Sequence, residues 1–309
     1  MKLDKIISEL QSAPNDPVLC FPLVAAGVER GPAGYHQLYA SYFREGILFT
    51  YGRTEQQEMI ASMLTQRPKL IASLLSQRKP HITPMAVLVA DLQNSVSLCA
   101  ELPAEEYFEL INQIWQRAEP IFRKYQGTYG KHAGDGMLYY FLPQPDSDYK
   151  MNAIECALEL KEMMNRLTRA WQDRKGWFNE LYLNVGLHEG REWFGAFHAG
   201  SHVEFTVLGD TVNQASRLSD FARKGSVWAT KSMINQIPTA ERSAIHFGVH
   251  REGDRGERRL VSQSYSCIRN LCKADEPPHY KFREIEMLPI TEILGVKSND
   301  SLDAERGEV

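Results

Sequence analysis

The chain has 309 residues, a formal net charge of −4, and 43% hydrophobic and 24% charged residues. A chain of this length can bury a core that needs neither disulfides nor a structural metal. Its balance of charge lacks the strongly basic character of nucleic-acid-binding proteins, so a phosphorylated small molecule is the better class of partner. Five scattered cysteines form no C-x-x-C pair, and no stretch has the length of a membrane span. We therefore expect a cytoplasmic protein with reduced thiols.

Changes in composition predict three regions. Residues 1–84 are polar and mixed, with an expected helix from Glu55 to about Arg78, and form an N-terminal accessory segment that ends at "QRKPHITP". Residues 85–270 carry the regular patterns of a folded domain. Residues 271–309 form a C-terminal extension, which we expect to be partly disordered because the tail after Gly295 is polar.

Within residues 85–270, hydrophobic periodicity and turn residues predict a series of strands and helices. They are a buried strand at 85–91, a helix between Pro103 and Gly127, a hairpin around 134–136, a helix at about 149–174, a pair of strands within 181–197, and a strand, turn and helix within 205–222. This order is typical of an α+β domain with a ferredoxin-like, mostly antiparallel sheet that carries helices on one face.

Two aspartates stand at the ends of predicted strands. Asp91 ends the apolar run "MAVLVAD", and Asp135 lies between two glycines in "KHAGDGMLYYF". A strand cap and simple hairpin geometry would each account for one of them. Carboxylates at the ends of adjacent strands would nevertheless meet at one edge of the sheet, where they could bind a hard divalent cation.

Four short segments then resemble the motifs of one family, the class III nucleotide cyclases. These segments are "VADLQNS", "KHAGDG", "VGLHEGREWFG" and "LGDTVNQASRL", in this order within residues 85–270. The resemblance implies a lyase that converts a nucleoside triphosphate to a 3′,5′-cyclic nucleotide and pyrophosphate. It also implies a head-to-tail homodimer, in which each active site combines residues of both subunits.

The resemblance assigns roles to individual residues. Asp91 and Asp135, with the carbonyl of Leu92, would bind two Mg²⁺ or Mn²⁺ ions. Asn213 would orient the ribose, and Arg217 would stabilise charge on the α-phosphate, because a guanidinium meets phosphate oxygens bidentately and stays charged. Asn213 and Arg217 are four residues apart on a predicted helix and share a face. A solvated helix face is the alternative interpretation of this pair.

The chain differs from the family pattern where the triphosphate would bind. Asn94 and Val96 stand on either side of Ser95, in a phosphate loop that usually has Gly and Thr at these positions. The late phosphate-binding Lys of the family has no match. Arg251 or Arg255 could replace it, although either could equally be a solvated turn residue.

Recognition of the base depends on a different set of residues. Lys131 occupies a position that helps to read a purine in the family, but the usual Asp partner is replaced by Thr206. This pair permits ATP without requiring it. A pyrimidine would leave space in the pocket, which Tyr51 or Arg53 could fill, although a packed Tyr and a surface Arg are the alternative.

The layout is similar to that of the stand-alone pyrimidine cyclases of bacterial anti-phage signalling, whose cyclic UMP or cyclic CMP activates a downstream effector. We therefore rank UTP first as the substrate, ATP second and GTP third. A catalytically inactive nucleotide-binding or dimerisation module is the alternative of another class. The presence of both aspartates, Asn213 and Arg217 argues against it. RNA binding is disfavoured because the predicted sheet lacks a basic face studded with aromatic residues.

Overall fold

The computed structural model describes residues 28–31, 34–38, 81–199, 202–252, 257–272 and 280–297. The chain divides into two compact units. The first comprises Met1–Thr83, Thr128–His132 and Glu192–Gly209, and the second comprises Pro84–Gly127, Ala133–Arg191 and Asp210–Val309. The helix expected between Glu55 and Arg78 lies outside the described residues, as do Tyr51 and Arg53.

The first unit contains short antiparallel pairings. Strand β1 (Val28–Gly31) pairs with β2 (Gly34–Leu38). Strand β7 (His202–Leu208) pairs with the second half of β6 (Leu183–Ala199), in a register that runs from Trp193 opposite Leu208 to Ala199 opposite His202. Most of β4 (Thr128–Ala133) also belongs to this unit.

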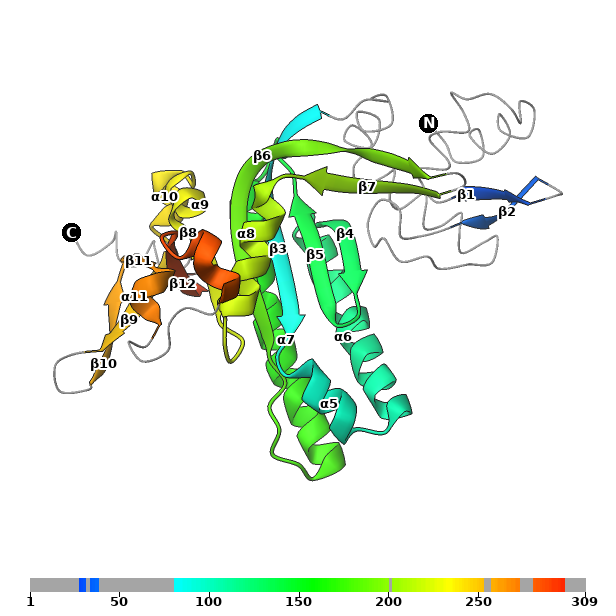
Figure 1. Ribbon diagram of the computed structural model, residues 1–309, viewed down its shortest axis with the longest axis horizontal. Coiled ribbons are helices and arrows are strands. Elements are labelled where there is room, and N and C mark those ends of the chain that lie inside the picture. The colour runs from blue at the N-terminus through cyan, green and yellow to red at the C-terminus, as the bar shows by residue number, and fades with distance from the viewer. Residues whose placement is uncertain are drawn as a thin grey trace. The chain divides into compact units, whose positions relative to one another are not determined.

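The second unit is built on a mixed sheet (Figure 1). Strands β6 and β8 run parallel, whereas the pairs β3–β5, β8–β12, β9–β12 and β9–β10 are antiparallel. The strand order is β10 (Arg258–Ser262), β9 (Ile245–Glu252), β12 (Pro289–Val296), β8 (Val227–Thr230), β6, β3 (His81–Leu92) and β5 (Gly136–Phe141), with β11 (Ser266–Cys267) paired to β12.

The helices of this unit differ widely in length. They are α5 (Ser95–Glu101), α6 (Ala104–Lys124), α7 (Tyr149–Lys175), α8 (Asp210–Phe221), α9 (Lys231–Asn235), α10 (Thr239–Arg242), α11 (Ile268–Leu271) and the 3₁₀ helix η2 (Tyr280–Ile285). The helices predicted at 103–127 and 149–174 are confirmed as α6 and α7. Within the described part of the chain, no helix combines the length and apolarity that a membrane crossing requires.

Polar contacts join α6 to α7. The indole nitrogen of Trp171 donates a hydrogen bond to Gln113 Oε1 at 3.2 Å, and Lys175 forms an ion pair with Glu106 at 2.6 Å. Helix α7 begins after Asp148, whose carboxylate accepts from the backbone nitrogens of the first turn, and it ends at Gly176 with φ 62°. Each end of the helix therefore carries a cap of a familiar kind.

Helix α8 packs closely on β6. A Cβ atom on Gly186 would lie 2.1 Å from the carbonyl oxygen of Ala215, and one on Gly190 would lie 2.2 Å from Thr211 Oγ1. These glycines therefore allow a close helix–strand approach and do not form a turn. The strand pair expected within 181–197 is wrong, because β6 runs through both glycines as one strand of 17 residues.

The helices of the second unit lie on both faces of the sheet. Gly186 and Gly190 face α8, whereas Glu189 points the other way and accepts a hydrogen bond from Tyr149 of α7 at 3.1 Å. Figure 1 shows α8 in front of the strands and α7 behind them. The sequence predicted helices on one face, so α8 adds a second layer. A buried cluster that includes Leu218 and Trp228 fills the space under it.

The sheet continues beyond residue 270. Strand β12 lies between β8 and β9, and Ile290 and Ile293 within it are fully buried. Residues 280–297 therefore form part of the core, although the sequence placed them in an extension. Their partners are distant along the chain, and a periodicity argument does not detect such pairing. Residues 298–309 lie outside the described part.

Candidate active site

The register of β3 and β5 brings the two expected metal ligands to the same edge of the sheet. Ala90 pairs with Met137, so Asp91 follows this pair on one strand and Asp135 precedes it on the other. Asp91 is half-buried near the end of β3, and Asp135 lies in the connection between β4 and β5. The register therefore places both aspartates at the same end of the β3–β5 pair.

One carboxylate oxygen of Asp135 is buried. Its Oδ2 atom is buried and, among the described residues, has no hydrogen-bond partner. Gly134, which precedes it, has φ 64° and so permits the tight connection that aims this side chain. Leaving a buried carboxylate oxygen unpaired costs free energy, so such an atom calls for an explanation such as a bound ion.

Tyr107, in the first turn of α6, lies in the field of the same carboxylates. Burial raises the pKa of Tyr107 above its ordinary value, and the negative charges of Asp135, Cys99 and Asp91 raise it further. The sequence did not single out Tyr107, because only the packing of α6 brings this residue near the strand ends. Over the described residues, no group of three or more His, Cys, Asp or Glu side chains has the arrangement of a metal site.

The loop after Asp91 has an unusual backbone conformation at Asn94. This residue is exposed, has φ 58°, and precedes α5, whose Leu98 nitrogen donates to the Asn94 carbonyl at 3.0 Å. Asparagine tolerates this left-handed region better than most non-glycine residues, so it can replace the usual glycine here. Ser95 begins α5, and the side chain of Val96 is largely exposed.

Asn213 and Arg217 lie on α8, away from its packed side. Ala215 and Leu218 are fully buried under the helix, whereas Asn213 is exposed and the Arg217 side chain is 38% exposed. Arg217 lies 3.7 Å from a carboxylate oxygen of Asp220, one turn further along. The expected pair therefore shares an accessible face, which a molecule approaching α8 could contact.

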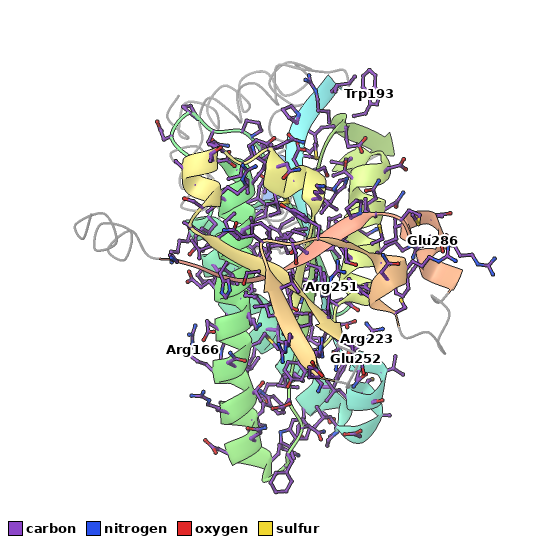
Figure 2. All side chains as sticks on the ribbon, turned by 90° about the vertical axis from the view of Figure 1, so that its left-hand side faces the viewer. Arg166, Trp193, Arg223, Arg251, Glu252 and Glu286 are labelled. Carbon is purple, nitrogen blue, oxygen red and sulfur yellow. The ribbon has the colours of Figure 1, made fainter. Side chains whose placement is uncertain are left out.

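The remaining predicted residues are more scattered. Lys131 is exposed in β4, and Thr206 lies in β7 opposite Gly195; both belong to the first unit. Arg251 is exposed near the end of β9, opposite Arg259 of β10, and is labelled in Figure 2. Arg255 lies outside the described residues, as Tyr51 and Arg53 do.

Comparison with known families identifies the chain's class. Residues 77–253, more than half of the chain, match the family described as the adenylate and guanylate cyclase catalytic domain. The chain therefore belongs to this family, the class III cyclases.

Individual relatives are distant. The chain is 24% identical over 155 residues to adenylate cyclase 1 of Rhizobium meliloti (strain 1021), which covers 49% of this chain and 23% of that protein. It is 22% identical over 161 residues to an adenylate cyclase of Anabaena cylindrica, covering 51% of this chain and 31% of that protein. The chain thus matches about a quarter to a third of the length of these curated relatives.

Solved structures share the fold. The adenylyl cyclase CyaB from P. aeruginosa superposes with a TM-score of 0.55 at 20% identity, covering 72% of this chain and 98% of that chain. The guanylyl cyclase Cya2 superposes with a TM-score of 0.54 at 17% identity, covering 72% of this chain and 96% of that chain. At this level of identity, the likeness supports the fold alone.

Proposed function

We propose that the chain is a metal-dependent nucleotide cyclase, which converts a nucleoside triphosphate to a 3′,5′-cyclic nucleotide and pyrophosphate. The observation that carries this proposal is the buried Oδ2 of Asp135, which has no hydrogen-bond partner among the residues that the structure describes and lies at the same sheet edge as Asp91. Two carboxylates in this position fit a cation better than they fit an apolar core, and they stand in a domain of the cyclase family.

Asp91 and Asp135 would hold two divalent ions, Mg²⁺ or Mn²⁺, with the Leu92 carbonyl as a further ligand. All three groups offer the oxygen ligands that these hard cations prefer. When bound, such ions neutralise phosphate charge and promote ionisation of a coordinated hydroxyl. Asn94 ends the adjoining loop and Ser95 begins α5, and there the Asn94 side chain and the Ser95 hydroxyl would contact the β- and γ-phosphates.

The reaction forms one bond and breaks another. The ribose O3′ would give its proton to water and attack the α-phosphorus, and the bond from that phosphorus to the oxygen that bridges it to the β-phosphate would break, so that pyrophosphate leaves with the electron pair on that oxygen. Asn213 would orient the ribose, while Arg217 would stabilise the charge that develops on the α-phosphate. Both lie on the accessible side of α8, which supports a homodimer in which they act on the nucleotide held by the partner's carboxylates.

For the base, we infer that UTP is the favoured substrate and cyclic UMP the product. A threonine at position 206 offers a hydroxyl that can donate or accept, in place of a fixed negative charge, and Lys131 can donate to a base carbonyl. Tyr51 or Arg53 would fill the space beside a pyrimidine, and Arg251 or Arg255 would contact phosphate. The product would then act as an anti-phage second messenger on a separate effector.

One experiment tests both levels of this proposal. The purified chain is given ATP, GTP, CTP and UTP separately, at equal concentration with Mg²⁺ or Mn²⁺, and pyrophosphate and the cyclic product are measured by coupled assay and mass spectrometry. We expect the largest turnover with UTP. Turnover of ATP at least tenfold better than UTP would make the chain an adenylate cyclase. Release from none of the four would favour the inactive binding module.

A further inference from the structure

The turn that follows α8 has a strained backbone. Lys224 and Gly225 have φ 54° and φ 66°, and the Ser226 nitrogen donates to the Arg223 carbonyl at 3.1 Å across them. Two successive residues with positive φ define a turn of type I′, which favours Gly, Asn or Asp at both central positions. Lysine at the first of these positions persists only where its surroundings fix the conformation.

Two side chains fix this turn from outside. Gln93 Oε1 accepts from the backbone nitrogen of Lys224 at 2.7 Å and from Asn184 Nδ2 at 3.4 Å. Asn184 Oδ1 in turn accepts from the backbone nitrogen of Gly225 at 3.1 Å. Asn184 is 5% exposed, so its amide is shielded from water, whereas Gln93 is partly buried.

Gln93 belongs to the phosphate loop. It lies two residues after Asp91 and directly before the left-handed Asn94, and its backbone nitrogen donates to the Tyr182 carbonyl at 2.9 Å. The turn that it holds comes one residue after Ala222, whose nitrogen closes the last turn of α8. The hydrogen bonds therefore run from the loop beside one metal ligand to the end of the helix that carries Arg217.

We propose that Gln93 is a positioning residue that ties the phosphate loop of a subunit to its own α8. This inference rests on the proposed function. In a head-to-tail homodimer, the loop of one subunit serves one active site and its α8 serves the other. Gln93 therefore couples the two active sites through a single subunit. Its side chain lies beside one active site, and through the turn after α8 it positions Arg217, which belongs to the other active site.

A heterodimer with one working site can distinguish an effect of Gln93 on Arg217 from an effect of Gln93 on the nucleotide bound beside its own loop. One subunit carries Asp135→Ala and the other carries Arg217→Ala, so the intact site combines the carboxylates of the second subunit with Arg217 of the first. Gln93→Ala is then added to the Asp135→Ala subunit, whose phosphate loop lies in the inactive site. We expect kcat at the intact site to fall about tenfold with KM unchanged, because small displacements of a catalytic group are costly.

Two further variants serve as controls in the same subunit. Gln93→Glu keeps an oxygen acceptor for Lys224 and should restore kcat, since this loop faces no reacting nucleotide. Gln144→Ala removes another partly buried glutamine, which donates to the Leu142 carbonyl, and should leave the kinetics unchanged. An unchanged kcat with Gln93→Ala would overturn the coupling. A heterodimer that is inactive with Gln93 intact, although labelling demonstrates subunit exchange, would instead overturn the shared-site function.

Hydrogen exchange tests the link without any activity. In the full-length protein, Gln93→Ala should speed exchange of the Lys224 amide by about tenfold, because the amide loses its protein acceptor and the strained turn opens more readily. Amides in the middle of α7 should exchange at the wild-type rate. Equal exchange at Lys224 in the variant and the wild type would show that Gln93 does not hold the turn.

Discussion

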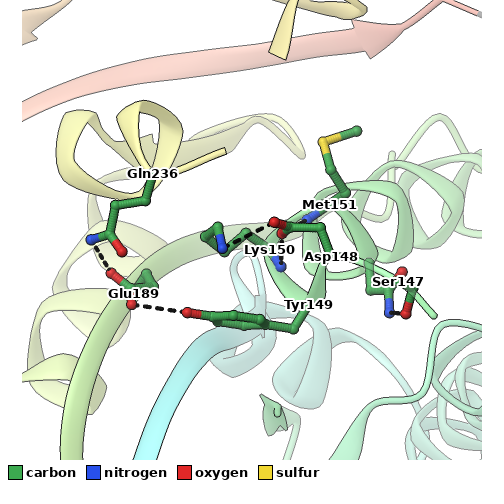
Figure 3. A network of polar contacts seen from close by, with 8 residues as sticks. Ser147, Asp148, Tyr149, Lys150, Met151, Glu189 and Gln236 are labelled. Atoms are coloured by element: carbon green, nitrogen blue, oxygen red, sulfur yellow. Dashed lines mark hydrogen bonds and ion pairs between the residues drawn. The ribbon is translucent and has the colours of Figure 1, made fainter. Parts of the chain in front are cut away.

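Asp135 and Glu189 are two carboxylates of the same unit that differ in whether protein groups hydrogen-bond their buried oxygens. Glu189 is 6% exposed, and its oxygens accept hydrogen bonds from the Tyr149 hydroxyl and the Gln236 amide (Figure 3). The buried Oδ2 of Asp135 has no partner within the described ranges. Protein groups satisfy the oxygens of Glu189, whereas under the proposed function a bound cation would satisfy the buried oxygen of Asp135.

Replacing Asp135 should have the largest effect on turnover. Asp135→Ala removes a preorganised charged group, so we expect kcat to fall by about 10²-fold or more. The midpoint of thermal unfolding should not fall, since the change also removes a buried oxygen that no described residue hydrogen-bonds. Pyrophosphate release and a melting curve measure the two effects, with exposed Asp146→Ala as the control. Retention of more than a few per cent of the activity would contradict the metal assignment, and a strongly lowered melting point would make Asp135 structural.

Replacing Glu189 should give the reverse pattern. Glu189→Ala leaves the Tyr149 hydroxyl and the Gln236 amide without their acceptor, and we expect a loss of about 2 kcal/mol in the free energy of unfolding. Turnover per folded molecule should be preserved. Urea unfolding measures the loss, and Glu189→Gln, which retains one acceptor oxygen, should lose less. Inactivity of a fully stable Glu189→Ala protein would instead assign Glu189 to the active site.

The sequence predicted those parts of the molecule that depend on short-range patterns. Asp91 and Asp135 stand out because a strand and a hairpin each place an acidic residue at an end, and the long helices follow from apolar periodicity. The contacts of Glu189 were beyond such reasoning, since Tyr149 lies 40 residues away in the chain. The Gln93–Lys224 hydrogen bond spans 131 residues, and only the folded sheet brings its partners together.

Glycines were the most ambiguous signal. Gly190 has the sequence character of a turn, yet it is a strand residue that makes room for Thr211. Local composition does not distinguish a glycine that bends the chain from one that admits a neighbour, because both need a missing Cβ. The predicted strand pair failed for this reason, while the motif that contains Gly186 and Gly190 was still found.

The pKa of Tyr149 provides a test, with a smaller expected effect, of the hydrogen bond between Tyr149 and Glu189. Burial raises the pKa of Tyr149, and the charge of Glu189 and the hydrogen bond to it raise the pKa further. A raised pKa means that the folded state holds the phenolic proton more tightly than the unfolded state does, so the resulting stability is complete below the unfolded pKa of about 10 and is lost as pH rises above it.

Tyr149→Phe should cost about 1 kcal/mol at neutral pH, because one hydrogen bond to Glu189 is lost. The variant should then lose less stability than the wild type when the pH is raised above about 10, because its residue 149 has no proton to release. Urea unfolding at several alkaline pH values measures how steeply the free energy of unfolding falls with pH in the variant and in the wild type. Tyr182→Phe is a second case of the same kind: a hydrogen bond to Glu180 and partial burial raise the pKa of Tyr182 to about 12, so this variant should also lose less stability than the wild type above pH about 10. Equal slopes for Tyr149→Phe and the wild type would show that the Tyr149 hydroxyl does not donate a hydrogen bond to Glu189. Gln236 would then be the hydrogen-bond donor on which the buried Glu189 carboxylate depends.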